Sequence, residues 1–156
     1  MTPPTPDDWT RLAIECAAAL ANTTLGMPFE VESLAAPEPV PQEGIGAYVA
    51  IVGEVVRVEI GIAANYDTCQ LLAQALFGDD TPLPEPDVVD AMGELANIIA
   101  GGVQGGMTPL FPGLTLGLPL VVQGRVQATE HQVIARVAIR LGTERAWLLV
   151  LRSRGS

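Results

Sequence analysis

The apolar residues of this chain follow two different repeats, and the order in which these repeats alternate limits the folds available to it. From about Pro6 to Asn22 they recur every three or four residues, which is typical of a helix with one buried face. From Phe29 to Ser33 apolar residues alternate with glutamates, which is typical of a half-buried strand. Because both patterns return further along, the chain is predicted to be α+β, with helices packed on an antiparallel or mixed sheet.

The full predicted order is one helix, three strands, two helices and three strands. After the first strand, the expected strands are the Val-, Ile- and Leu-rich runs Ala47–Val52, Val55–Ile62, Leu114–Val122, Val133–Leu141 and Ala146–Leu151. Asn65 is expected to cap the second helix, which ends at Gly78. Asp87 is expected to cap the third, with Asp90 completing a capping box, and this helix runs to about Met107.

Length, charge and cysteine content exclude several classes of function. The 156 residues fit a single domain, residues 1–156. A net charge of −10 argues against nucleic acid and anionic membranes as partners, because phosphate contacts need a local excess of Lys and Arg. No signal peptide or membrane-spanning run is evident, so a cytoplasmic protein is expected. Cys16 and Cys69 are expected to be buried reduced thiols, and with one histidine no metal site is expected.

The third predicted helix carries the residues that most suggest a function. At about 100° per residue, Asp90, Glu94, Asn97 and Gly101 fall within an arc of roughly 60°, which we call the polar stripe. Apolar residues occupy the opposite side: Met92, Leu95, Ala96, Ile99 and Val103. An ordinary solvated helix face would look similar. However, the asparagine and the glycines each weaken a helix, by up to about 1 kcal/mol, and local rules broken together often mark function.

The residue types of the polar stripe fit hydrolysis by an oriented water molecule. A carboxamide both donates to and accepts from water, so Asn97 can position one without titrating. A carboxylate one turn earlier, Glu94, can pair with a partner's lysine and fix the docking register. No Ser, Cys or Thr lies in a sequence context that suggests an activating base, which disfavours a covalent nucleophile.

Two further signals on this helix have ordinary explanations. The run Gly101–Gly106 lacks the Gly-Lys-Ser/Thr ending of a phosphate-binding loop, and we expect a loosely wound helix end that lets neighbours pack closely. Gln104 lies on a neighbouring part of the same face and is expected to be solvated.

The spacing Asp90-x-x-x-Glu94-x-x-Asn97-x-x-x-Gly101, followed by the run Leu116–Gly124 with Pro119 inside it, resembles the CheX/CheC/FliY chemotaxis phosphatases. That group shares a helix with acidic, Glu and Asn positions, followed by a strand entered through a proline. The resemblance is strongest over about residues 85–125. It implies a CheC-like or CheX-like fold and a phosphatase acting on the phospho-aspartate of a CheY-type response-regulator receiver domain, in chemotaxis or related two-component signalling. It also implies that Asn97 orients the attacking water, that Glu94 contacts the regulator, and that Asp90 and Gly101 help to bind it.

The same resemblance gives expectations about cofactor and assembly. Mg²⁺ is expected on the receiver domain, with no cofactor on this chain. The first helix has no Glu-x-x-Asn, so the single-site CheX-like branch fits best, and that branch implies a homodimer. The alternatives are a non-catalytic adaptor that binds a receiver domain or a flagellar switch component, and a structural dimerisation module. The intact Glu94 and Asn97 pair favours the phosphatase over both.

Overall fold

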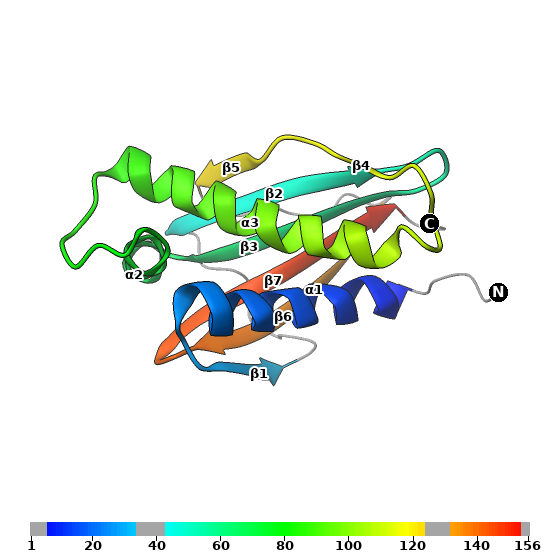
Figure 1. Ribbon diagram of the computed structural model, residues 1–156. Coiled ribbons are helices and arrows are strands. Elements are labelled where there is room, and N and C mark those ends of the chain that lie inside the picture. The colour runs from blue at the N-terminus through cyan, green and yellow to red at the C-terminus, as the bar shows by residue number, and fades with distance from the viewer. Residues whose placement is uncertain (1–5, 34–42, 124–131, 154–156) are drawn as a thin grey trace.

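Three helices pack on one face of a seven-stranded antiparallel sheet (Figure 1). The structure is a computed structural model that describes residues 6–33, 43–123 and 132–153. The helices are α1 (Pro6–Leu20), which continues into a short π-helical turn (η1, Ala21–Leu25), α2 (Tyr66–Phe77) and α3 (Glu85–Met107). The strands are β1 (Phe29–Ser33), β2 (Gly44–Val52), β3 (Arg57–Asn65), β4 (Thr115–Leu116), β5 (Leu120–Gln123), β6 (Gln132–Leu141) and β7 (Glu144–Ser153). The predicted α+β class is therefore confirmed.

The order of the strands places β1 at one edge of the sheet and the last described strand, β7, in its interior. The strands lie in the order β1-β6-β7-β3-β2-β4. β5 also pairs with β2, along the part of β2 that precedes the residues paired with β4. One edge is therefore β1, and the other is formed by β4 and β5 in turn. The α1 and α3 helices lie side by side over the sheet, and α2 packs near the start of α3 (Figure 1).

The prediction of one strand over Leu114–Val122 is wrong, because this segment forms two short strands. Ile51 of β2 pairs with Leu116, and Tyr48 of β2 pairs with Leu120. Between these pairs β2 has two residues, whereas the edge has three: Gly117, Leu118 and Pro119. The edge therefore contains a one-residue bulge, and Pro119 within it has no N–H to give to a ladder.

Most helix ends follow the predicted capping residues, but the start of α3 does not. The side chain of Asn65 accepts the N–H of Thr68 at 2.9 Å, and Gly78 ends α2 with φ 66°, as predicted. Asp87, in contrast, lies inside α3, which begins after Pro84 without a side-chain cap. The N–H groups of Asp87 and Val88 donate to the carbonyl of Pro84, so the helix begins before Asp87. Asp90 consequently has no capping-box role.

The second and third strands are displaced from their predicted limits. β2 begins at Gly44 rather than Ala47, and β3 spans Arg57–Asn65 rather than Val55–Ile62. Val55 is 80% exposed and lies in the turn between the two strands, where the N–H of Gly53 donates to the carbonyl of Val56 at 2.8 Å. Valine is typical of strands even where it lies in a tight turn, and for this reason the predicted start of the third strand is two residues too early.

The main core lies between the helices and the sheet. The predicted buried side of α3 is confirmed, since all five of its apolar residues are buried: Met92, Leu95, Ala96, Ile99 and Val103. A smaller apolar cluster, which includes Tyr48 and Trp147, occupies the opposite face of the sheet. Cys69 is buried as predicted, whereas Cys16 is only partly buried, and both are free thiols. The buried apolar side of α3 therefore packs in the core, and the polar stripe lies on the opposite, outward side.

Candidate functional site

The polar stripe faces outward along α3, as the helical spacing predicts. Asp90 and Glu94 are exposed, whereas Asn97 and Gly101 are partly buried. The difference arises because α3 contacts β2 and α1 and also lies beside the edge formed by β4 and β5. Asn97 lies one turn from both Gly93 and Gly101, and each of these glycines has a residue of the edge beside it. Asn97 is thus placed near the border between the helix surface and the sheet edge.

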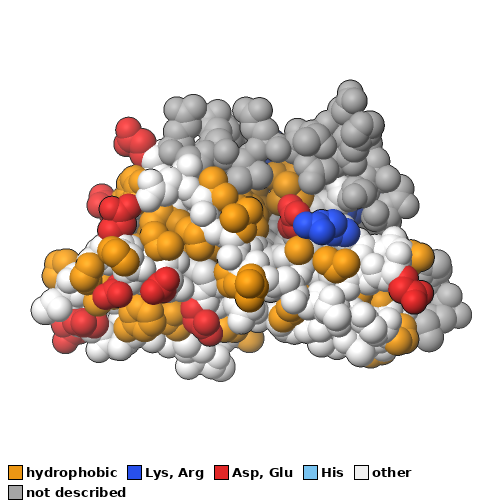
Figure 2. Space-filling view, turned by 90° about the horizontal axis from the view of Figure 1, so that it is seen from above, with side chains coloured by type: hydrophobic (Ala, Val, Ile, Leu, Met, Phe, Trp, Pro, Cys, Tyr) orange, Lys and Arg blue, Asp and Glu red, His pale blue; other side chains and the backbone are white. Residues whose placement is uncertain are grey.

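The three polar side chains of the stripe have no partner in the part of the chain that the structure describes. Among residues 6–33, 43–123 and 132–153, no hydrogen bond or ion pair involves the side chain of Asp90, Glu94 or Asn97. The sequence from residue 58 to residue 124 contains no lysine or arginine. Figure 2, which views the molecule of Figure 1 from above, shows acidic side chains gathered mainly over one half of the surface, with apolar side chains between them. The carboxylates of the stripe are therefore available to a cation from another molecule.

The glycines of α3 are explained by the elements that pack against them. A Cβ at Gly102 would lie 2.6 Å from Sγ of Cys16, and one at Gly106 would lie 3.1 Å from Leu12. These two glycines let α1 approach α3 closely, which confirms the packing predicted for the Gly101–Gly106 run. The expectation of loose winding is wrong, because α3 is a continuous α-helix to Met107.

Two other glycines of α3 face the sheet edge. A Cβ at Gly93 would be 3.5 Å from Cβ of Pro119, and one at Gly101 would be 3.8 Å from Cδ1 of Leu116. Both distances are ordinary van der Waals contacts. Gly101 therefore has the edge of the sheet on one side, and only its outward side is open to a partner.

Gln104 was expected to be solvated, and this expectation is wrong. Its Nε2 donates to the carbonyl of Leu114 at 2.7 Å, which fastens the end of α3 to the residue before β4. At the other end of the helix, Nε2 of Gln123 in β5 donates to Oε1 of Glu85 at 2.7 Å. The sheet edge is thus hydrogen-bonded to α3 both before and after the polar stripe along the helix.

Ile98 is a candidate contact residue that the sequence pattern did not single out. It follows Asn97, lies one turn after Glu94, and is 37% exposed. Its residue type does not distinguish it from the other apolar residues of this helix. The signal that could have found it is its angular position, which lies beyond the arc of the buried residues.

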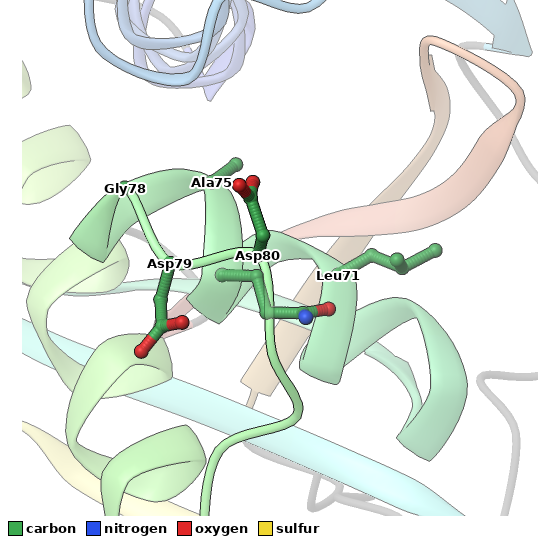
Figure 3. Close-up of a pocket in the computed structure, with 6 residues that line it drawn as sticks. Leu71, Ala75, Gly78, Asp79 and Asp80 are labelled. Atoms are coloured by element: carbon green, nitrogen blue, oxygen red, sulfur yellow. The ribbon is translucent and has the colours of Figure 1, made fainter.

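An open depression of about 380 Å³ lies at the end of α2 (Figure 3). Its lining includes Asp79 and Asp80 but no residue of α3. The N–H and hydroxyl of Thr81 both donate to the carboxylate of Asp79, at 2.9 and 2.8 Å, and these bonds lower the pKa of Asp79. Asp79 therefore shapes the turn after α2.

Neither a metal centre nor a membrane span is evident in the part of the chain that the structure describes. Its histidine, cysteine, aspartate and glutamate side chains form no group of three or more that could hold a metal ion. None of its helices combines the length and the apolar character that crossing a membrane requires.

Comparison with known proteins identifies the family. A family model described as chemotaxis phosphatase CheX matches residues 45–141, which is more than half of the chain and includes the whole polar stripe. The chain belongs to the CheX family. No curated protein sequence matches it.

Solved CheX structures share this fold at low sequence identity. CheX from Vibrio vulnificus is 15% identical, with a TM-score of 0.74, over 93% of this chain and 96% of that one. CheX from Desulfovibrio desulfuricans is 16% identical, with a TM-score of 0.76, over 93% and 99%. The complex of CheX with CheY, BeF3 and Mg²⁺ from Borrelia burgdorferi matches at 16% identity and a TM-score of 0.65, over 92% and 96%. The predicted CheX-like fold is confirmed.

Proposed function

We propose that this CheX-family chain hydrolyses the phospho-aspartate of a CheY-type receiver domain, and that Asn97 and Glu94 are its catalytic residues. The observation that carries the proposal is the placement of these two side chains. They lie on one outward surface of a helix whose back is buried, and no described side chain engages either of them. An amide and a carboxylate presented in this way can enter the site of another protein.

Asn97 orients the attacking water. Its carbonyl oxygen accepts one hydrogen bond from the water and its NH₂ group can donate another to the phosphoryl oxygens, so the amide fixes the water in line with the phosphorus. The water oxygen bonds to phosphorus as the bond from phosphorus to the aspartate oxygen breaks. The products are a free carboxylate and inorganic phosphate, which takes up the water proton. Catalysis of this kind is mainly positioning and electrostatics.

Glu94 docks the receiver domain. Its exposed carboxylate has no basic residue near it in the sequence, so it is free to pair with the lysine expected beside the phosphorylation site. Asp90 lies one turn earlier on the same side and has no capping role, so it extends the docking surface. Gly101 leaves room for the receiver on its outward side.

The remaining expectations belong to the same proposal. Mg²⁺ is assigned to the receiver, which the Borrelia burgdorferi complex of CheX, CheY, BeF3 and Mg²⁺ supports. We also propose that residues 1–156 form a single domain, that the protein is a homodimer, and that it works in the cytoplasm. Signalling in chemotaxis is the process to which the family assigns it.

The test is dephosphorylation of a panel of phosphorylated CheY-type receiver domains, with and without this protein. The proposal predicts that at least one receiver loses phosphate faster when the protein is present. Binding that depends on phosphorylation without faster loss would replace the phosphatase with the adaptor. No effect on any receiver would contradict both.

A further inference from the structure

The bulge at the sheet edge brings two apolar side chains to α3. In a regular strand Leu116 and Pro119, three residues apart, would point to opposite faces of the sheet. The extra residue between the β4 and β5 pairings changes this, so that Leu116 lies against Gly101 and Pro119 lies against Gly93. Leu118 instead lines a cavity on the other face with Tyr48 and is 91% exposed.

These two contacts bracket Asn97. Gly93, Asn97 and Gly101 are spaced by four residues, so they form one row along the side of α3 that faces the edge. Asn97 is the only member of this row with a side chain beyond Cα. Its neighbours on the row are glycines, so Leu116 and Pro119 reach the helix surface on either side of the amide.

The edge is held in this place rather than resting loosely on the helix. Gln104 fastens the residue before β4, Gln123 fastens the end of β5, and the N–H of Gly117 donates to the carbonyl of Ala50 at 2.8 Å. Bulges are frequent beside active sites, where they redirect side chains. Here the bulge lies next to an amide that has no hydrogen bond of its own within the described residues.

We propose that Leu116 and Pro119, brought together by the bulge, are positioning residues that restrict the side-chain rotation of Asn97. This inference rests on the proposed role of Asn97 in orienting water. An asparagine on an open helix surface samples several side-chain orientations, and most of them would point a water away from the phosphorus. The two apolar side chains narrow this choice before the receiver binds.

The first test measures the order of the Asn97 amide without any receiver. ¹⁵N relaxation of side-chain NH₂ groups compares Asn97 with Asn22, which is exposed and serves as the mobile reference. Asn97 is expected to be clearly more ordered than Asn22. Deletion of Leu118, which removes the extra residue, and Leu116→Ala are both expected to bring Asn97 to the level of Asn22. Leu116→Met, which conserves volume, should retain the order.

Leu120→Ala is the matched control, because Leu120 is on the same edge, is 64% exposed and lines the cavity on the opposite face. It should leave the amide unchanged. An Asn97 amide as mobile as Asn22 in the wild type, or equally ordered in Leu116→Ala, would overturn the inference. If deletion of Leu118 prevents folding, Leu116→Ala decides the question.

The second test connects order to turnover. With a receiver that the wild type dephosphorylates, Leu116→Ala should lower the rate at saturation by about tenfold or more and change Kd by less than about threefold. Leu116→Met should restore the rate. An unchanged rate despite a mobile amide would also overturn the inference. If the amide is ordered but no receiver is dephosphorylated, the proposed function fails while the restriction of Asn97 stands.

Discussion

Asn97 and Glu94 are three residues apart, yet their surroundings differ in a way that fits the different tasks proposed for them. Asn97 is partly buried, and a neutral amide keeps the same hydrogen-bonding groups at any pH in the working range. Glu94 is exposed and charged, which suits attraction of a cationic partner. At this scale, the proposed function gives the orientation of water to the amide and the docking of the receiver to the carboxylate.

Glu94→Gln is expected to weaken binding far more than turnover. The substitution keeps the shape of the side chain and removes only its charge, so Kd for a beryllofluoride-activated receiver should rise about tenfold, equivalent to about 1.4 kcal/mol. The rate at saturating protein should change by less than about threefold. Calorimetry and single-turnover kinetics measure the two quantities. Glu30→Gln, which makes the same change at an exposed carboxylate on β1, at the other edge of the sheet, is the control and should alter neither.

At the scale of elements, α3 is a compromise between helix stability and close packing. Its glycines weaken the helix, but at Gly102 the absence of a side chain is what permits contact with Cys16 of α1. Gly105, three residues later, has no atom within 4 Å of the position its Cβ would take. Comparison of Gly102 with Gly105 therefore separates the helix stability that a glycine removes from the close packing that a glycine permits.

Gly102→Ala is expected to lower the free energy of unfolding by about 1 kcal/mol, because Sγ and Cβ of Cys16 must move. Gly105→Ala is expected to raise it by about 0.5–1 kcal/mol, since it gains helix propensity and meets nothing. Urea unfolding followed by circular dichroism compares both with the wild type. Equal stabilisation by the two substitutions would show that α1 does not constrain Gly102.

The elements also show how far sequence reasoning reached. The outward orientation of Asp90 and Glu94 was predictable, because helical geometry fixes angular positions from spacing alone. The break at Pro119 was missed because the apolar run Leu114–Val122 continues through it. The bond from Gln104 to Leu114 was beyond prediction, since it depends on where the sheet edge comes to lie beside α3. Local sequence patterns thus predict which face of a helix is exposed, whereas the hydrogen-bond partners of its side chains depend on the tertiary structure.

At the scale of the whole molecule, both faces of the sheet carry buried side chains, and burial favours the neutral form of two titratable groups. Burial, with a smaller contribution from the charge of Glu59, raises the pKa of Tyr48 to about 12. Burial also raises the pKa of Cys69 to about 11. The folded state therefore favours the neutral forms of both side chains.

This arrangement predicts a loss of stability at alkaline pH. Both groups have higher pKa values when folded than when unfolded, so their contribution is complete below about pH 9 and declines as the pH rises toward 12. Tyr48→Phe should remove about 2 kcal/mol of that decline. Urea midpoints measured from pH 7 to pH 11.5 test this expectation. Parallel curves for the wild type and Tyr48→Phe above pH 9 would contradict it.

The central claim is that one amide on α3 performs the water-orienting step, and a single comparison tests it directly. The measurement is the dephosphorylation rate of a CheY-type receiver at saturating wild type, Asn97→Ala and Asn22→Ala, together with Kd for each. The account predicts that the wild type and Asn22→Ala accelerate the loss of phosphate equally, and that Asn97→Ala binds with similar Kd but gives no acceleration. Turnover retained by Asn97→Ala, or lost only because binding is lost, would contradict the account.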